Sequence, residues 1–451
     1  MCRPRVDLPC ARWASVAQAI FFALCLLLSA SVARAQDQAD VDPPATASGE
    51  ADLPPAENET AGEFTPAKGF DLVTTRWGSL NISFYGLVRY VNQLPGDQTD
   101  VDHLGRVREV KARNDLNWHR TMVWFSGFAL DPRLRYVVTV WSLPTTQQSL
   151  IFGNLQFTFA PALTLGAGIG PTLTARSMQG SHPFWASSDR QMGEEFFRGG
   201  FSSGVWLKGE PFSRFHYILS INTNLSQLGV TAANDSRDFA YSASLAWLPT
   251  TGEYGLRGGL ADFEQHQKVA TRFGVSAAQA REDRASALTE EPNATQLRLS
   301  DGLLLFSDGA LAAGVTVQRA TYQVLAADMG LKYQGFTLQA EYFVRRLFNF
   351  QATGALPMKS ILDHGFFAQA MYMAVPKLVG VYASGTAVFD DFERFPWEMS
   401  GGVSFFPMSS RSLRLNLHFI YVDRSPTGSV FGFYTAGQRG PTVSIGADFL
   451  L

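Results

Sequence analysis

From about residue 78 to the C-terminus, apolar and polar residues alternate in short segments of the chain. Residues 413–419 are the plainest example: three leucines and a phenylalanine alternate with an arginine, an asparagine and a histidine. Successive side chains of a β-strand point to opposite faces. The pattern therefore predicts strands with one apolar face and one polar face, which is typical of a β-barrel in an outer membrane.

The fold class predicted from this alternation is all-β, a transmembrane antiparallel β-barrel of about sixteen strands. An even number of strands is what single-chain bacterial barrels have. The expected strands are residues 78–91, 116–129, 133–142, 150–159, 163–170, 201–208, 214–223, 239–247, 270–280, 322–333, 336–347, 365–374, 378–388, 398–406, 413–422 and 442–449.

The connections between these segments alternate in length. Short ones rich in Pro and Gly follow most even-numbered strands, as at 130–132, 160–162, 210–212, 334–335, 375–377 and 407–411. Odd-numbered strands are followed by long excursions, as at 92–115, 171–200, 224–238, 281–321, 348–364 and 423–439. This asymmetry predicts short periplasmic turns and long extracellular loops. The connection 248–269 is too long for this scheme, so it is either an insertion or contains a hairpin that the pattern misses.

The N-terminal residues 1–35 are expected to be a signal peptide. Three arginines precede the apolar run 19–28, and the small-residue site Ala33-Arg34-Ala35 follows it, which predicts cleavage before Gln36. The alternative is an uncleaved membrane anchor, although the run is short for a span of roughly 20 residues. All three cysteines of the chain lie in this segment, so no disulfide or cysteine metal site is expected in the mature protein.

Residues 36–68 form an acidic Ala/Pro-rich linker that we expect to be disordered, either as a periplasmic tether or as a solvated leader. The first 68 residues hold five of the 37 basic and nine of the 40 acidic residues. The barrel region, residues 69–451, therefore carries 32 basic and 31 acidic residues. Its net charge gives no argument for anion or cation preference, so any selectivity must be local.

Three stretches resemble a known family, namely Asp189-Arg190 with the following 195–200, the run 331–342, and 365–370 leading into 375–377. The chain resembles the phosphate-selective porin O and P family of bacterial outer-membrane channels. The resemblance implies a sixteen-stranded barrel, a homotrimer, and an inward-folded loop that narrows the pore. Members usually end in phenylalanine, a signal for the barrel-assembly machinery, whereas this chain ends in Phe449-Leu450-Leu451.

The loop 171–200 is the best candidate for a channel constriction, because its mixed charges could act in a confined and poorly screened space. The candidate constriction residues are Arg176, His182, Asp189, Arg190, Glu194, Glu195 and Arg198. We expect this loop to fold inward and set the conductance. The alternative is an ordinary external loop whose charges meet water or lipopolysaccharide.

Candidate lumen-wall residues follow from the alternation, because a charge that faces lipid at the membrane midplane costs roughly 2–4 kcal/mol. They are Arg89, Arg214, His216, Gln339, Glu341, Arg345, Arg414, Asn416 and His418. These arginines and histidines could attract anions. Alternatively, Arg214, Arg345 and Arg414 pair with wall acids such as Glu341 and only hold the lumen open.

Together these patterns predict a porin, a water-filled channel for passive diffusion of small hydrophilic solutes or ions, which could include anions such as phosphate. The expected partners are outer-membrane lipid and lipopolysaccharide, and no nucleic acid, cofactor or metal is expected. A structural or adhesive barrel without an open channel is the main alternative. A hydrolase is a weaker one, since the chain contains no His-Glu-x-x-His motif and no phosphate loop.

Overall fold

The computed structural model describes residues 69–143, 148–179, 185–225, 238–254, 262–284, 297–428 and 432–451. The expected signal peptide and acidic linker lie outside the described residues.

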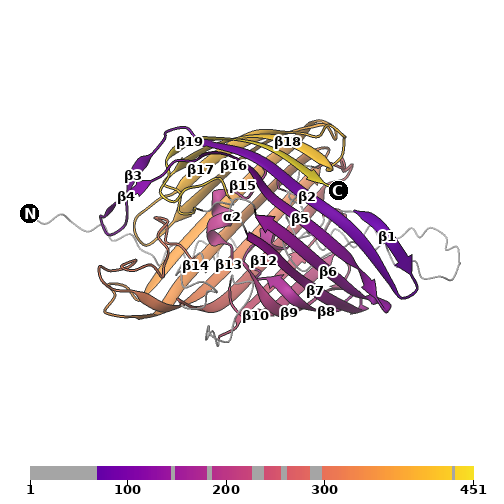
Figure 1. The fold of residues 1–451 in the computed structure, drawn as a ribbon, viewed down its shortest axis with the longest axis horizontal. Coiled ribbons are helices and arrows are strands. Elements are labelled where there is room, and N and C mark those ends of the chain that lie inside the picture. Colours follow the sequence, from indigo (N-terminus) through magenta and orange to yellow (C-terminus); the bar gives the residue numbers. More distant parts are fainter. Residues whose placement is uncertain are drawn as a thin grey trace, which may run out of the picture. The chain divides into compact units, whose positions relative to one another are not determined.

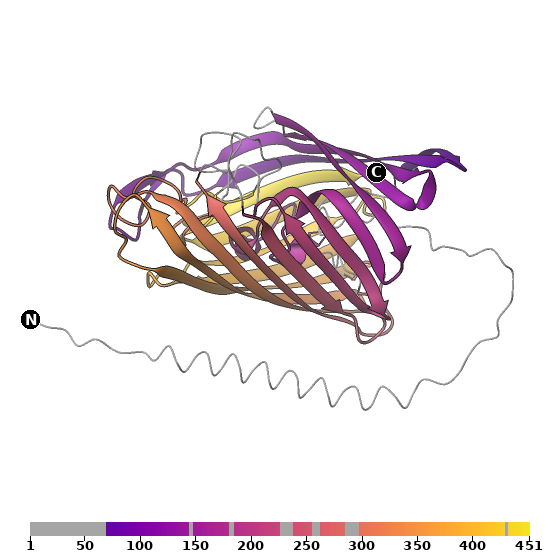
Figure 2. The ribbon, with the colours of Figure 1, turned by 90° about the horizontal axis from the view of Figure 1, so that it is seen from below.

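Sixteen antiparallel strands form a closed β-barrel (Figure 1). Each strand pairs with the next, and the last strand pairs with the first, so that Thr442 lies opposite Gln93 and Leu450 opposite Tyr85. The strands are tilted in the same sense around the ring (Figure 2). They are β2 (Gly78–Gln93), β5 (Asn114–Ala129), β6 (Asp131–Leu143), β7 (Gln148–Ala160), β8 (Leu163–Pro171), β9 (Phe201–Phe212), β10 (Phe215–Asn222), β11 (Ala240–Trp247), β12 (Ala270–Asp283), β13 (Val317–Tyr333), β14 (Phe336–Ala352), β15 (Ser360–Val375), β16 (Val379–Phe389), β17 (Trp397–Phe405), β18 (Leu413–Asp423) and β19 (Gly440–Leu450).

The predicted fold class is confirmed, and each of the sixteen expected strands corresponds to one strand of the barrel. Several strands are longer than expected, such as β13 and β15. Their backbone pairing with neighbouring strands continues beyond the residues in which apolar and polar side chains alternate. Strand β11 pairs directly with β12 along nearly its whole length, so the connection 248–269 adds no hairpin to the ring between them, and its described parts, 248–254 and 262–269, contain no strand.

The short connections gather at one end of the barrel, called here the short-turn end, and the long ones at the other, the long-loop end. Five residues of the short connections have positive φ: Leu130, Arg214, Gln334, Lys377 and Ser409. At Gln334 and Gly335 both φ angles are positive, 45° and 84°, as a two-residue type I′ hairpin turn requires. Tight turns of this kind fix the register of the strands that they join.

Several smaller elements were not expected from the sequence. Strand β1 (Phe70–Thr75) pairs with the start of β2 and extends beyond the ring at the short-turn end (Figure 1). A hairpin of β3 (Gln98–Val101) and β4 (Val107–Val110) lies in the first long loop. The loop after β8 contains the 3₁₀ turn η3 (Arg176–Met178) and the short helix α2 (Met192–Phe197). Among the described residues, no helix is long and apolar enough to cross a membrane.

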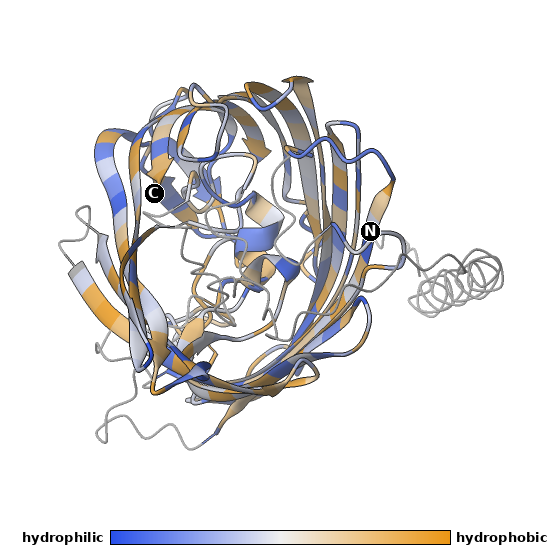
Figure 3. Ribbon diagram, turned by 90° about the vertical axis from the view of Figure 1, so that its right-hand side faces the viewer, coloured by the Kyte–Doolittle hydropathy of each residue, from blue (hydrophilic) through white to orange (hydrophobic). Residues whose placement is uncertain are grey.

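The two faces of the strands explain the alternation in the sequence. On β18, the outward side chains of Leu415, Leu417 and Phe419 are exposed, whereas their inward neighbours are buried. Blue and orange residues accordingly alternate along many strands (Figure 3). An exposed apolar belt of this extent is not found on ordinary soluble monomers, and it matches the apolar band of barrels that face lipid.

Candidate functional site

The loop between β8 and β9, called here the internal loop, lies inside the ring of strands in its described parts, residues 172–179 and 185–200 (Figure 3). In its described parts, 172–179 and 185–200, all but two residues are buried. Because the ring of strands encloses the loop, side chains of the loop contact the inner surface of the wall on several strands. The position is the one that the constriction hypothesis requires.

Oxygen atoms of wall side chains accept hydrogen bonds from backbone amides of the loop. The amide of Arg176 donates to Glu341 Oε1 of β14 over 2.8 Å, and that of Met192 donates to Glu398 Oε2 of β17 over 3.0 Å. The amide of Leu173 donates to Ser242 Oγ of β11 over 2.9 Å. A buried amide without a partner would cost roughly 1–3 kcal/mol, so these contacts fix the path of the loop.

Asp189 is the main ionic contact between the loop and the opposite part of the wall. One of its carboxylate oxygens accepts hydrogen bonds from Arg89 of β2 over 3.1 Å and from Arg120 of β5 over 3.0 Å. All three side chains are buried. Two guanidinium groups, from β2 and β5, therefore share one carboxylate of the loop.

Part of the barrel interior is apolar. Phe197 of α2 stacks on Phe343 of β14, with ring centroids 4.9 Å apart and an angle of 9° between the planes. A side chain at Gly365 of β15 would approach Phe197 to 2.9 Å, so glycine leaves room for the ring. Met178 and Met192 belong to the same buried cluster. The loop is therefore held by packing as well as by polar contacts, unlike a loop in a uniformly polar lumen.

The other candidate constriction residues that the structure describes contact side chains of the internal loop itself. Arg190 lies over the ring of Trp185, 4.7 Å from its centroid, and Glu195 pairs with Arg198 over 2.7 Å. Glu194 is fully enclosed, and burial raises the pKa of this loop carboxyl above its ordinary value despite the opposing charges of Arg176 and Arg190. His182 lies outside the described residues.

Most of the candidate wall residues lie on the inner face. The structure buries Arg89, Gln339, Glu341, Arg345, Arg414, Asn416 and His418, and places His216 in the inward register of β10. Arg345 pairs with Asp363 over 2.6 Å and Arg414 with Asp448 over 2.7 Å. The partners are thus aspartates of the adjacent strands rather than Glu341, which accepts the amide of Arg176 instead.

Arg214 is a correction to the predicted wall. It lies on the turn between β9 and β10, with φ of 67°, and its side chain is exposed. Its guanidinium donates to the carbonyl oxygens of Pro249 and Thr250. Strand β10 begins one residue later, so the inward alternation that applies to His216 does not extend to Arg214.

The inner wall is buried unevenly around the ring. On β12 to β19 most inward side chains are covered by the internal loop, among them Arg272, Glu341 and Glu398. On β5 to β9 several inward side chains stay partly exposed. These form the lumen strip, a term used here for Asp115, Asn117, Arg135, Trp141, Phe152, Asn154 and Lys208. Sequence reasoning did not single out this strip, because alternation indicates the face of a residue but not what covers it.

Long loops contact one another at the long-loop end. The buried carboxylate of Asp100 in β3 accepts hydrogen bonds from Arg108 of β4 over 2.9 Å and from Arg439 over 3.3 Å. Arg394 approaches it to 3.6 Å. His103 contacts Asp301 over 2.7 Å, and its ring lies against that of Phe392, with centroids 4.2 Å apart and the planes tilted by 32°. The β3–β4 hairpin therefore joins four loops above the barrel.

Comparison with solved structures bears on the fold. The barrel is similar to the outer-membrane expressed OmpT of Vibrio cholerae, with a TM-score of 0.51, 10% sequence identity, and coverage of 84% of this chain and 99% of that chain. The chain has the fold of a solved outer-membrane β-barrel. Searches against family models and against curated proteins give no match, so the resemblance to the porin O and P family stays a prediction.

Two other solved structures are similar at lower scores. An anion-selective porin from Comamonas acidovorans has a TM-score of 0.48 and 11% identity, covering 82% of this chain and 100% of that chain. The outer-membrane channel DcaP of Acinetobacter baumannii has a TM-score of 0.47 and 9% identity, covering 85% of this chain and 99% of that chain.

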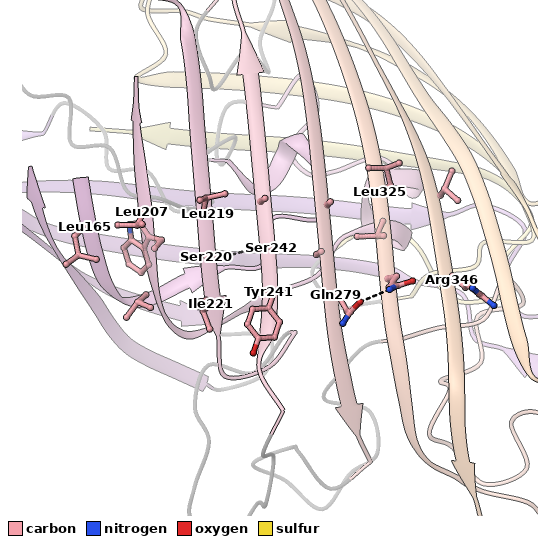
Figure 4. Close-up of a pocket in the computed structure, with 18 of the residues that line it drawn as sticks. Leu165, Leu207, Leu219, Ser220, Ile221, Tyr241, Ser242, Gln279, Leu325 and Arg346 are labelled. Atoms are coloured by element: carbon pink, nitrogen blue, oxygen red, sulfur yellow. Dashed lines mark hydrogen bonds between the residues drawn. The ribbon is translucent and has the colours of Figure 1, made fainter. Parts of the chain in front are cut away.

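The outer surface of the barrel is hollowed over β8 to β14 (Figure 4). Leucines such as Leu219 and Leu325 flank small residues, Ala243 and Ala277, which leave a shallow apolar groove. Gln279, Gln323 and Arg346 are polar residues on the outward face of this groove, and Gln323 donates to Gln279 over 2.6 Å. This groove lies on the outward face and is separate from the lumen.

Proposed function

We propose that this protein is an outer-membrane porin through which small hydrophilic solutes or ions diffuse passively. The observation that carries the proposal is the combination of a closed barrel, an apolar outer belt, and an internal loop beside a partly exposed lumen strip. A loop folded into a barrel narrows the space that a solute can cross. The proposal assigns no catalysis to the protein, and the short-turn end is assigned to the periplasm.

A preference for anions is the finer part of this proposal. Arg135 and Lys208 are partly exposed bases of the lumen strip, whereas Asp115, its acid, pairs with Arg113 over 2.9 Å. The two arginines at Asp189 add positive charge nearby. Charges act strongly in a confined lumen, so this distribution favours anions. Phosphate is one anion that this chemistry would admit.

Conductance in planar bilayers tests the channel. The expected result is discrete single-channel currents, with a reversal potential in a KCl gradient that lies toward the chloride equilibrium potential. A second test removes residues 180–188 from the chain between β8 and β9. We expect a higher conductance from this deletion, and an unchanged value would contradict the constriction role of the loop.

A closed barrel with a structural or adhesive role is the second candidate. It is favoured by one observation, namely that the described loop residues are almost all buried against the wall of β12 to β19. A barrel of this kind would insert into bilayers without carrying current. The lumen strip is the feature that favours the channel, because a sealed interior would bury those side chains as well.

Assembly as a homotrimer in contact with lipid and lipopolysaccharide belongs to the same proposal. The apolar groove of Figure 4 offers close approach for a neighbouring barrel, because Ala243 and Ala277 lack large side chains. Chemical crosslinking in native outer membranes tests this. Crosslinked trimers that disappear when Ala243 is changed to Trp would support it, and a monomer in both proteins would contradict it.

A further inference from the structure

We propose that the connection between β11 and β12 forms a second constriction at the periplasmic end, with Tyr254 and Phe263 as the obstructing side chains. The inference rests on the proposed channel function. It concerns the described residues 248–254 and 262–269, called here the periplasmic segment. Periplasmic connections of bacterial barrels are usually short turns, and two to five residues are enough to join antiparallel neighbours.

Tyr254 lies against the inner face of β13. The side chain is buried, and a Cβ at Gly330 would come within 2.2 Å of its hydroxyl oxygen. Lys332 lies 5.0 Å from the centroid of the Tyr254 ring and donates to the Tyr254 carbonyl over 3.3 Å. Gly330 shares the inward register of Asp328, which is buried. The phenol ring therefore occupies the lumen at a place where the wall has no side chain.

The periplasmic segment is tied to the turn between β13 and β14. The buried carboxylate of Asp262 accepts hydrogen bonds from the amide of Gly335 over 2.8 Å and from the amide of His266 over 2.9 Å. The amide of Gln334 donates to the His266 carbonyl over 2.9 Å. These contacts hold residues 262–266 at the rim rather than away from it.

Phe263 reaches the next part of the wall. Its ring meets that of Phe406 edge to face, with centroids 5.1 Å apart. Phe406 is fully buried, next to Met373 of β15 and Tyr382 of β16. Ala186 of the internal loop belongs to the same cluster. The periplasmic segment therefore contacts the wall from β12 to β17 and shares an apolar cluster with the loop that enters from the opposite end.

These contacts define what the segment does to a solute. The aromatic rings of Tyr254 and Phe263 reduce the free cross-section of the lumen near its periplasmic exit. The Tyr254 ring lies next to Lys332 and the Arg272–Asp328 pair. A solute that passes the internal loop must then pass these rings. Both constrictions act in series, so their electrical resistances add and each one lowers the conductance, while the narrower one sets the size limit for a solute.

Single-channel conductance is the first measurement. We expect Tyr254→Ala, and Phe263→Ala as a second variant, to raise the conductance about twofold relative to the unsubstituted protein. The matched control is Tyr333→Ala, because Tyr333 lies on β13 at the same end but faces outward and is exposed. Heat-dependent mobility in gels verifies that each barrel is folded. Equal conductance in folded Tyr254→Ala, Phe263→Ala and control proteins would overturn the inference.

A labelling measurement separates this inference from the channel proposal. Thr337 of β14 lies opposite Lys332 and is buried on the inner face. Thr337→Cys is made in a background in which Cys2, Cys10 and Cys25 are serine, and a charged hydrophilic maleimide is the probe. We expect Tyr254→Ala to increase the labelling rate at least about fivefold, as burial is relieved. The rate at Ser213→Cys, on an exposed turn, should stay constant.

The two measurements fail in different ways. If no protein carries current but Tyr254→Ala increases labelling of Thr337→Cys, the channel proposal fails and the obstruction by Tyr254 stands. If the unsubstituted protein conducts and Tyr254→Ala changes neither conductance nor labelling, the channel stands and the periplasmic constriction is wrong.

Discussion

Arg89 of the first barrel strand donates a hydrogen bond of 3.1 Å to Asp189 of the internal loop, and both side chains are buried. The contact joins parts of the chain that are a hundred residues apart and fixes the loop on the β2 and β5 side of the lumen. On the other side, Glu341 and Glu398 hold the loop through backbone amides. The position of the loop therefore depends on acids and bases from opposite parts of the ring.

Asp189→Asn is expected to loosen the loop. It removes the carboxylate charge that Arg89 and Arg120 share, and removing one partner of a buried ion pair typically costs about 3–5 kcal/mol. We expect a lower free energy of unfolding in guanidinium and noisier single-channel currents. Asp308→Asn is the control, because the Asp308 carboxylate is largely exposed in its pair with Arg284. Equal stability of the two variants would show that Asp189 does not anchor the loop.

The selectivity of the channel should depend on the lumen strip rather than on the paired wall arginines. Arg345 and Arg414 are buried in ion pairs with aspartates, whereas the side chains of Arg135 and Lys208 are partly exposed to the lumen. We expect Arg135→Gln and Lys208→Gln to move the reversal potential in a KCl gradient toward zero. The paired arginines are tested with the double changes Arg345→Met with Asp363→Met, and Arg414→Met with Asp448→Met.

Each double change removes one positive and one negative charge and leaves the net charge of the lumen unchanged. The reversal potential should therefore stay within error of the unsubstituted value. A larger shift from either pair than from Arg135→Gln would support the hypothesis from the sequence that wall arginines attract anions directly. That result would also place the solute path beside β12 to β19 instead of β5 to β9.

The loops at the long-loop end should open when Asp100 is removed. Its carboxylate contacts arginines from three segments, Arg108, Arg394 and Arg439. Asp100→Ala leaves these cations without their shared partner, so we expect several-fold faster trypsin cleavage after Arg108 and Arg439 in intact liposomes. Asp97→Ala is the matched control, since its pair with Lys111 is exposed. Trypsin resistance equal to that of the control would show that other contacts hold the loops.

Alternation predicted all sixteen strands because the side-chain period of a strand is independent of its partners. It also predicted an inward position for Arg345 and Arg414, but not their partners. Asp363 and Asp448 lie on neighbouring strands, and only the register places them opposite. The same limit explains Arg214, where one residue decides between turn and strand, and the inward folding of Tyr254, which depends on the space at Gly330.

Asp301, in the loop between β12 and β13 at the long-loop end, makes the free energy of unfolding depend on pH. Burial alone would raise the pKa of its carboxyl, but hydrogen bonds from His103 and from the amide of Leu303 outweigh burial and lower the pKa to about 2. In an unfolded chain an aspartate has a pKa near 3.9. The folded state therefore binds this proton less tightly than the unfolded state does.

The sign of the effect follows from this difference. A lowered pKa stabilises the folded state above about pH 4, and the contribution is lost as the pH falls to about 2. For this shift it amounts to about 2–3 kcal/mol. We therefore expect Asp301→Asn to lower the free energy of unfolding near pH 6 by about that amount, and the difference to shrink toward pH 2. Unfolding in guanidinium between pH 2 and pH 6 measures it, and a difference that does not change with pH would rule out the charged Asp301 as its source.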